Sequence, residues 1–127
     1  KQRKLNISIL ILLVNRKNEE IMITQATIDE AIKRLVKAYN PLQIYLYGDY
    51  AWGTPNEEST FDVLIVVESS KERIIKRGYV AFEALLGLKI PKNVIVFTKE
   101  EFDKYAQDTG SSTYEIKTRG KVLYARD

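Results

Sequence analysis

The sequence predicts a single α/β domain in which helices pack on a central β-sheet, and three observations lead to this prediction. The chain has 127 residues, the length of one domain, and its 45% hydrophobic and 29% charged content is ordinary for a globular protein. Residues 61–67 form a nearly continuous apolar run, as in a strand buried on both faces. Segments with helical spacing of apolar residues alternate with such strands, which is typical of α/β domains.

Pairs in which a Ser or Thr is followed three residues later by Glu predict three helix N-termini. These pairs are Thr27 with Glu30, Ser69 with Glu72, and Thr98 with Glu101. After the first pair, apolar residues recur at helical spacing up to residue 39, and Pro41 disfavours helix at the residue before it. We expect the second helix to end near Gly87 or Pro91, and a short third helix to run through Tyr105.

Four strands are predicted, at residues 42–47, 61–67, 93–97 and 121–124. They are rich in β-branched and aromatic residues, which favour strands. Residues 110–113, which contain Gly and Ser, are predicted to be a loop within the domain. The sequence has no internal repeat and no low-complexity linker.

The first 21 residues differ in character from the rest. They combine basic residues with an apolar run at 7–14, which is far shorter than the roughly 20 residues of a membrane span. No small-residue cleavage site follows the run, so a signal peptide is not expected. We interpret residues 1–21 as an N-terminal extension or added element and residues 22–127 as the domain, and we expect a cytoplasmic protein without membrane association. The apolar run makes self-association into a homo-oligomer, or contact with a partner, a hypothesis.

The composition restricts the chemistry that is available. The chain has no Cys and no His, which excludes disulfides, thiolate sites and the commonest general base. Catalysis would have to use carboxylates, hydroxyls, Lys or Arg, with an oxygen-bound cation such as Mg²⁺. The net charge of +3 comes from 20 basic and 17 acidic residues without a dense basic block, which is weak support for nucleic-acid binding.

The stretch around residues 47–65 carries the strongest functional signal. A predicted strand ends at Gly48, a tight turn precedes a short helix that ends near Gly53, and a second strand begins near Thr60. Glycine at such a turn lets a ligand approach the backbone, and the free N–H groups of a helix start can hold phosphate. Asp62 on the adjacent strand would then hold a cation against that phosphate. The spacing alone favours an alternative, a strand–turn–helix with solvent-facing acids.

This stretch resembles the signature of the minimal nucleotidyltransferases of the DNA polymerase beta superfamily, which reads G-S-x-A-x-G, a short loop, then S-D-x-D-L. The residues that match at the family's spacing are Gly48, Ala51, Gly53, Ser59 and Asp62. The resemblance covers roughly residues 23–126, including residues 87–91 and the closing segments 113–116 and 119–124. It implies a polymerase beta-like fold with a small mixed sheet flanked by helices. It also implies Mg²⁺-dependent transfer of a nucleoside monophosphate from a triphosphate, with ATP as the expected nucleotide, to an acceptor.

The sequence departs from the family at its catalytic positions. The resemblance implies three metal-binding carboxylates, and these positions hold Thr60, Asp62 and Asn93, so only Asp62 keeps its charge. Asp49 replaces the serine that helps to seat the triphosphate, beside Gly48, Gly53 and Ser59 in the expected nucleotide-binding set. We expect the carboxylate of Asp49 to cap the short helix and repel phosphate. Asp49 and Asp62 as a relocated pair that binds one cation remain an alternative.

Three functions remain open at this point. The first is an active nucleotidyltransferase with a reduced metal site. The second is a non-catalytic binding or assembly module, such as the toxin–antitoxin partner of a HEPN-type protein that the resemblance suggests. The third is a variant disabled by deliberate substitution. Because the departures fall in the site and not in the core pattern, we expect catalysis to be lost or strongly reduced.

Several other residues are weaker candidates. Trp52 and Tyr50, beside the turn, are expected to pack the short helix, with stacking on a nucleotide base as the alternative. Tyr105 and Tyr114 are candidates for the rim of the cleft. A basic run on the second helix is expected to be a solvated face, or else a contact for nucleic acid or an acidic partner; its residues are Lys71, Arg73, Lys76 and Arg77.

Overall fold

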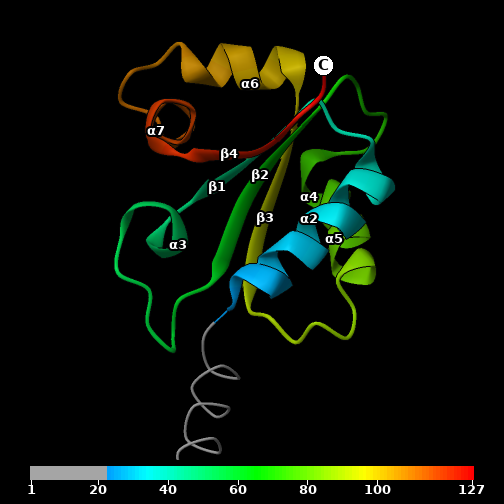
Figure 1. Cartoon of the computed structure of the whole chain (residues 1–127). Helices are drawn as coiled ribbons and strands as arrows, with labels where there is room; N and C mark the ends of the chain where they lie inside the picture. Colours follow the sequence, from blue (N-terminus) through cyan, green and yellow to red (C-terminus); the bar gives the residue numbers. More distant parts are fainter. Residues whose placement is uncertain (1–22) are drawn as a thin grey trace, which may run out of the picture.

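A computed structural model describes residues 23–127, so the apolar run at 7–14 and the boundary between 1–21 and 22–127 lie outside the described residues. The chain forms a four-stranded sheet in the order β3-β2-β1-β4 (Figure 1). The strands are β1 (Gln43–Tyr47), β2 (Phe61–Val67), β3 (Lys92–Thr98) and β4 (Lys121–Ala125). β1 is antiparallel to both β2 and β4, whereas β2 and β3 are parallel. The predicted small mixed sheet and its four strands are therefore confirmed.

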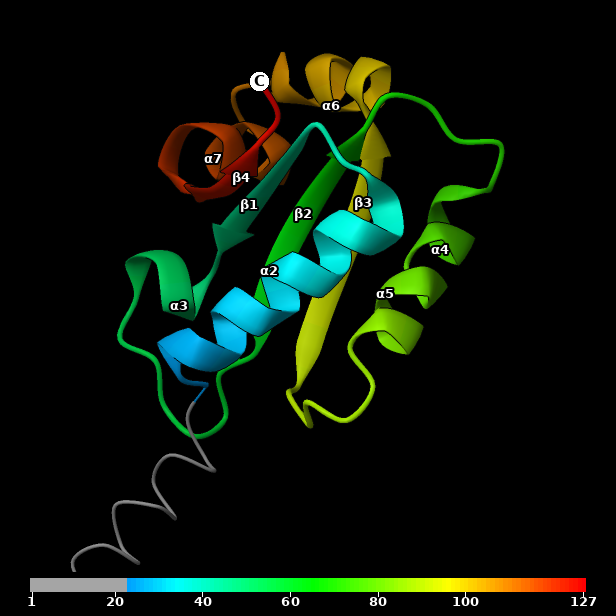
Figure 2. The same ribbon diagram turned by 45° about the vertical axis from the view of Figure 1, so that its right-hand side comes forward.

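Helices cover both faces of this sheet, as Figures 1 and 2 show. One face is covered by α2 (Gln25–Tyr39), α4 (Ile74–Arg77) and α5 (Tyr79–Ala84). The other face is covered by α6 (Lys99–Ala106) and α7 (Ser112–Arg119), and the short α3 (Asp49–Trp52) follows β1 at one end of the sheet. Within residues 23–127, no helix is long and apolar enough to cross a membrane.

The central strand β2 explains why its sequence is almost wholly apolar. Phe61, Val63 and Ile65 belong to the core under α2, α4 and α5, while Leu64 and Val66 belong to the core under α6 and α7. Successive side chains of a strand point to opposite faces, so a strand with a core on both sides needs apolar residues at every position.

The first helix begins one turn earlier than Thr27 predicts. Thr24 is its N-cap, and the backbone N–H of Thr27 donates to Thr24 Oγ1 at 3.2 Å. The predicted cap at Thr27 is therefore wrong, because that residue already lies in the first turn. The C-terminus is as expected: Asn40, before Pro41, takes a left-handed conformation with φ of 46°.

The second predicted helix is shorter and broken. Ser69 does not cap it, because Glu72 N–H donates to Ser70 Oγ in a loop and the helix begins only at Ile74. It is divided at Gly78 into α4 and α5. The third prediction is confirmed: Thr98 and Glu101 form a reciprocal capping box, with bonds of 3.2 and 2.8 Å.

Helix α7 is not predicted by the sequence analysis, which expects a loop at residues 110–113. Ser111 caps this helix by accepting from the N–H of Tyr114 at 3.1 Å. The sequence does carry a signal for it, because Ser112 and Glu115 have the same spacing as the other capping pairs. Only Gly110 and Ser111 of the predicted loop lie outside the helix.

Candidate functional site

Three neighbouring strands bring the central site residues together at one end of the sheet. Tyr47, the last residue of β1, is opposite Asp62 in β2, and Asp62 is opposite Asn93 in β3. Gly48 and α3 continue directly from β1, and the loop after α3 leads back to Thr60 at the start of β2 (Figure 1). The structure thus assembles residues from three separate parts of the sequence into one corner.

The three predicted catalytic residues form one hydrogen-bonded group. Asp62 Oδ1 accepts from the hydroxyl of Thr60 at 2.6 Å and from the amide Nδ2 of Asn93 at 2.8 Å. Asn93 Nδ2 also donates to Thr60 Oγ1 at 3.2 Å. A carboxylate only accepts, so the Asn93 amide must present its nitrogen to it. Two neutral donors thus bond the same oxygen of Asp62.

Gly48 allows Asp62 to lie directly against the turn. Its backbone has φ of 75° and ψ of −157°, a conformation that is essentially restricted to glycine. A Cβ at this position would lie 2.4 Å from Asp62 Oδ2. The Gly48 carbonyl also accepts from the N–H groups of Ala51 and Trp52, which starts α3. Glycine is therefore required both for the turn and for the approach of the carboxylate.

Asp49 is bound to the loop that precedes β2. Its Oδ2 accepts from the hydroxyl of Ser59 at 2.7 Å, and Ser59 Oγ in turn accepts from the N–H of Asn56 at 2.9 Å. The expectation that the Asp49 carboxylate caps α3 is wrong, because the N-cap is Gly48 and the carboxylate is bonded to Ser59 instead. A Cβ on Gly53 would lie 3.2 Å from both Cα and Oδ1 of Asp49, so a larger residue there would crowd Asp49.

Tyr47 adds a neutral phenol to the corner, and sequence reasoning missed it. Burial of its ring and, secondarily, the negative charge of Asp62 raise the pKa of Tyr47 to about 12. The phenol therefore stays protonated and neutral next to the carboxylate through the physiological range. A signal existed in the sequence, since Tyr47 ends the strand immediately before the glycine turn.

Trp52 and Arg119 lie next to Tyr47 at this corner. The Trp52 ring lies 6.4 Å from the Tyr47 ring, and the Arg119 guanidinium lies 5.0 Å from the centre of the Trp52 ring. Arg119 ends α7, so sequence reasoning that lacks this helix cannot place it at the corner. Tyr50 packs against the core and its hydroxyl accepts from the N–H of Ile23 at 2.9 Å, which confirms the packing interpretation.

Two weaker candidates are elsewhere. The ring of Tyr105 lies 5.0 Å from that of Phe97, near the end of β3 opposite to Asn93, so Tyr105 does not rim this corner. Arg77 is not part of a solvated basic face: its side chain is 8% exposed and donates to both carboxylate oxygens of Glu101, at 2.6 and 3.3 Å. These contacts lower the pKa of Glu101.

The donor set does not fit the two-metal centre that the resemblance implies. Such a centre needs several anionic ligands, whereas Asp62 is the one carboxylate among the three positions. Within residues 23–127, no group of three or more His, Cys, Asp or Glu side chains is placed to hold a metal ion. The residues at this corner therefore do not support a reaction step through a pair of metal ions.

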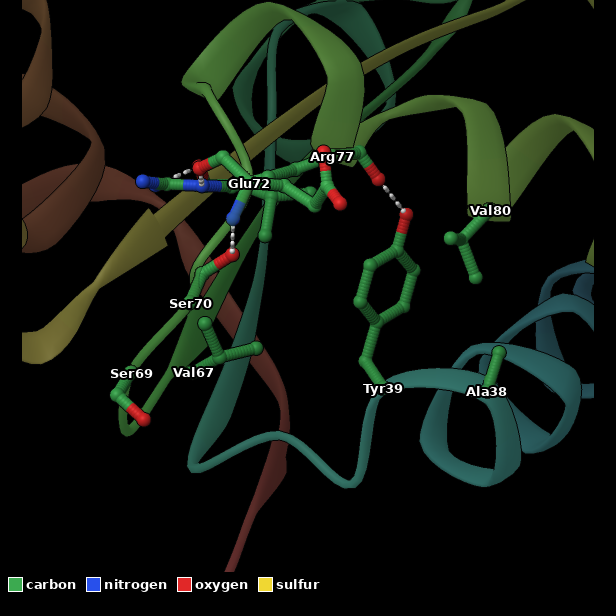
Figure 3. Close-up of a pocket in the computed structure, with 9 residues that line it drawn as sticks. Ala38, Tyr39, Val67, Ser69, Ser70, Glu72, Arg77 and Val80 are labelled. Carbon is green, nitrogen blue, oxygen red and sulfur yellow. Dashed lines mark hydrogen bonds between the residues drawn. The ribbon is translucent and has the colours of Figure 1, made fainter.

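A cavity of about 210 Å³ lies at the opposite end of β2 (Figure 3). It is lined by Val67, Ser70 and Glu72, together with Tyr39, whose hydroxyl donates to the carbonyl of Arg77 at 2.5 Å. Asp62 lies near the start of the same strand and does not line it. This cavity is thus separate from the corner around Gly48.

The mixed sheet and the glycine turn facing a strand carboxylate define a nucleotidyltransferase-type domain. The family model described as "Nucleotidyltransferase domain" matches residues 27–119, and the chain belongs to this family. The chain is also similar to a solved structure from Sulfolobus solfataricus that is provisionally assigned as a nucleotidyltransferase. The two are 19% identical over 81% of this chain and 90% of that one, with a TM-score of 0.49. No curated protein matches the chain.

Proposed function

We propose that this nucleotidyltransferase domain has lost, or retains only weakly, the Mg²⁺-dependent transfer of nucleoside monophosphate from ATP. We further propose that it serves as a binding or assembly module, such as the partner of a HEPN-type protein. The single observation that carries the proposal is the hydrogen-bonded group of Thr60, Asp62 and Asn93. It leaves one negative charge where two metal ions need several.

The energetic argument concerns the transition state. Metal ions in such sites stabilise the developing charge on the attacking and leaving oxygens by several kcal/mol. Because each 1.36 kcal/mol corresponds to a factor of ten in rate, loss of this term slows transfer by about a thousandfold or more. Asp49 adds a negative charge at the turn where the family seats the triphosphate, and this charge opposes phosphate binding.

A single-cation site built from Asp49 and Asp62 is the competing hypothesis. Both acids adjoin the glycine turn, because Asp62 Oδ2 lies against Gly48 and Asp49 is the residue that follows it. Each carboxylate is already bonded to neutral donors, Asp49 to Ser59 and Asp62 to Thr60 and Asn93. These donors bond one oxygen of each carboxylate, Asp49 Oδ2 and Asp62 Oδ1, and a cation would have to compete with them for those two oxygens, which favours the non-catalytic proposal.

A transfer assay tests the loss of activity. The chain is incubated with Mg²⁺ and ATP labelled on the α-phosphate, and both pyrophosphate release and labelled products are measured. We expect no turnover above background for the unsubstituted chain. The matched comparison carries Thr60→Asp, Asn93→Asp and Asp49→Ser, and the same three changes with Asp62→Ala serve as its negative control. Sustained Mg²⁺-dependent pyrophosphate release by the unsubstituted chain would refute the loss of activity.

A further inference from the structure

The outer side of α4 and α5 is apolar and uncovered by the described part of the chain. Five large apolar side chains are exposed along α4, α5 and the turn that follows α5, and those of Ile75 and Leu86 are 78% and 71% exposed. The set, which we call the α4–α5 surface, consists of Ile74, Ile75, Tyr79, Phe82 and Leu86; Val80 is not part of it, because it lines the cavity beside Tyr39. Figure 2 shows α4 and α5 at the right-hand edge of the molecule, beyond β3.

This surface is not the normal outer face of an amphipathic helix. The inner side of α5 is already apolar, with Ala81 fully buried and Leu85 only 1% exposed. A surface helix ordinarily carries polar residues opposite its buried stripe, and a helix that is apolar all round is one that is buried. The second apolar face of α5 therefore indicates burial against another molecule or segment.

Hydrogen bonds connect α4 and α5 to α2. The Tyr39 hydroxyl donates to the carbonyl of Arg77, as Figure 3 shows, and it also accepts from the N–H of Ala81, so α2 is bonded to both short helices. Arg34 donates to the carbonyls of Ala84 and Leu86 at 3.4 and 2.9 Å. Because polar contacts fix α4 and α5 from the inside, the apolar residues are presented outward in a defined arrangement.

The segment that carries this surface has a net positive charge, and this charge favours some binding partners over others. Residues 71–92 contain five basic side chains other than the buried Arg77 and two acidic ones, an excess of three positive charges. Lys92 Nζ lies 4.9 Å from the centre of the Phe82 ring, so positive charge directly adjoins the apolar patch. The basic residues are Lys71, Arg73, Lys76, Lys89 and Lys92, and the acidic ones are Glu72 and Glu83.

Two occupants are disfavoured by this charge. A second copy of the chain docked through the same surface would bring two faces of like charge together, which is destabilising. Residues 1–22 contain five basic and two acidic residues, so the chain's own N-terminal segment has the same sign. A partner whose apolar residues are flanked by carboxylates would instead satisfy both features of the surface.

We propose that the α4–α5 surface docks an amphipathic helix of a partner protein whose apolar stripe is flanked by acidic residues. This inference names the partner chemistry of the assembly module in the proposed function and rests on that part of it. Binding takes the helix-in-groove form, with apolar anchors at helical spacing and acidic flanks facing Lys76 and Lys92.

A peptide selection on the full chain tests this proposal. The library displays helical peptides with leucine at positions i, i+3, i+4 and i+7 and with flanking positions randomised among Glu, Lys and Gln. We expect the selected peptides to carry Glu flanks. The double substitution Ile75→Asp with Leu86→Asp should weaken their binding by about tenfold or more, because it removes central apolar contacts. Both residues are largely exposed, so the fold should survive, as circular dichroism would verify.

Two variants serve as controls. Val122→Asp introduces the same charge at another exposed apolar residue, 53% exposed on β4, and should leave peptide affinity unchanged. Arg73→Glu with Lys76→Glu should reverse the preference from Glu-flanked to Lys-flanked peptides.

Five outcomes would overturn the docking proposal. The first four are failure to select any binder, selection of Lys or Gln flanks, affinity that is insensitive to the Ile75 and Leu86 substitutions, and a concentration-dependent dimer that those substitutions abolish. The fifth is a gain of about tenfold in peptide affinity on Ile9→Asp with Leu12→Asp, which would show that the N-terminal segment competes for the surface.

These results are independent of the transfer assay. Turnover by the unsubstituted chain would refute the loss of catalysis without altering peptide binding.

Discussion

Asn93 Nδ2 donates a hydrogen bond to Asp62 Oδ1 at 2.8 Å across the parallel strands β3 and β2. The two residues are directly opposite in register, so this contact is set by the sheet and not by a flexible loop. An aspartate at residue 93 would place a second carboxylate against the first, an arrangement that a bound cation stabilises. The amide makes the same contact favourable without any cation.

Replacing Asn93 by aspartate should therefore make stability depend on metal. We expect Asn93→Asp to lower the free energy of unfolding by about 1–2 kcal/mol at neutral pH without divalent cations, because a hydrogen bond to a charged group is lost and replaced by repulsion. Mg²⁺ should restore part of this loss in the variant and have little effect on the unsubstituted chain. Thermal unfolding with and without Mg²⁺ measures both effects. Asn93→Ala is the matched control, since it removes the hydrogen bond without adding charge and should not respond to Mg²⁺.

Substitution of Gly48 should disturb both the backbone and Asp62. Gly48→Ala forces a side chain into a conformation that costs about 1–3 kcal/mol, and its Cβ would meet Asp62 Oδ2 at 2.4 Å. The steric part should disappear when Asp62 is truncated, so the cost of Gly48→Ala should be smaller in an Asp62→Ala background. A double-mutant cycle by denaturant unfolding measures this coupling. Equal costs in the two backgrounds would show that the close approach has no energetic consequence.

Tyr47 should titrate at unusually high pH. Burial and the charge of Asp62 raise its pKa to about 12, so the neutral phenol is favoured in the folded state. The associated stabilisation is fully present below the ordinary pKa of 10.0 and is lost as the pH rises through the folded-state value. Tyr47→Phe should remove one high-pH transition from the ultraviolet absorbance titration. Asp62→Asn should lower the pKa of Tyr47 only in part, because burial is the larger cause.

Glu101 should make stability fall in acid. The hydrogen bonds from Arg77 are the main cause of its lowered pKa, so its stabilisation is present above the ordinary value of 4.5 and is lost as the pH falls through the folded-state pKa. Glu101→Gln should lower the free energy of unfolding by about 1.5–3 kcal/mol at neutral pH. It should also flatten the dependence of stability on pH below 4.5. Lys99→Ala, which breaks an exposed ion pair with Asp103, should have a much smaller effect.

The sequence predicts an element of the fold correctly where its residue pattern is compatible with one structure only. Every apolar residue of β2 packs in a core, so its apolar run correctly indicates a doubly buried strand. The pair of Thr98 and Glu101 is a true capping box. The same spacing at Thr27 and Ser69 is misleading, because a capping pattern shows only that a residue can cap. Thr24 caps the first helix instead, and the Glu72 N–H donates to Ser70 Oγ in a loop before the second helix begins at Ile74.

The site is predictable as a set of residues, but its contacts are not. The resemblance to the nucleotidyltransferase signature, not the spacing alone, identifies Gly48, Asp62 and Asn93 as residues that meet at the corner. This spacing does not show that Asp49 bonds Ser59 in place of the α3 N–H groups, since that contact depends on the path of the loop before β2. Arg119 is missed for a similar reason, because its position over Trp52 follows from α7 returning to α3 in three dimensions.

Calorimetric titration of ATP, with and without Mg²⁺, tests the central claim most directly. It compares the unsubstituted chain with the variant that carries Thr60→Asp, Asn93→Asp and Asp49→Ser. If the hydrogen-bonded group around Asp62 has replaced the metal site, the unsubstituted chain binds no nucleotide in either condition, and the variant binds ATP only with Mg²⁺. Micromolar, Mg²⁺-dependent binding of ATP by the unsubstituted chain would contradict the claim and would favour a cation site built from Asp49 and Asp62.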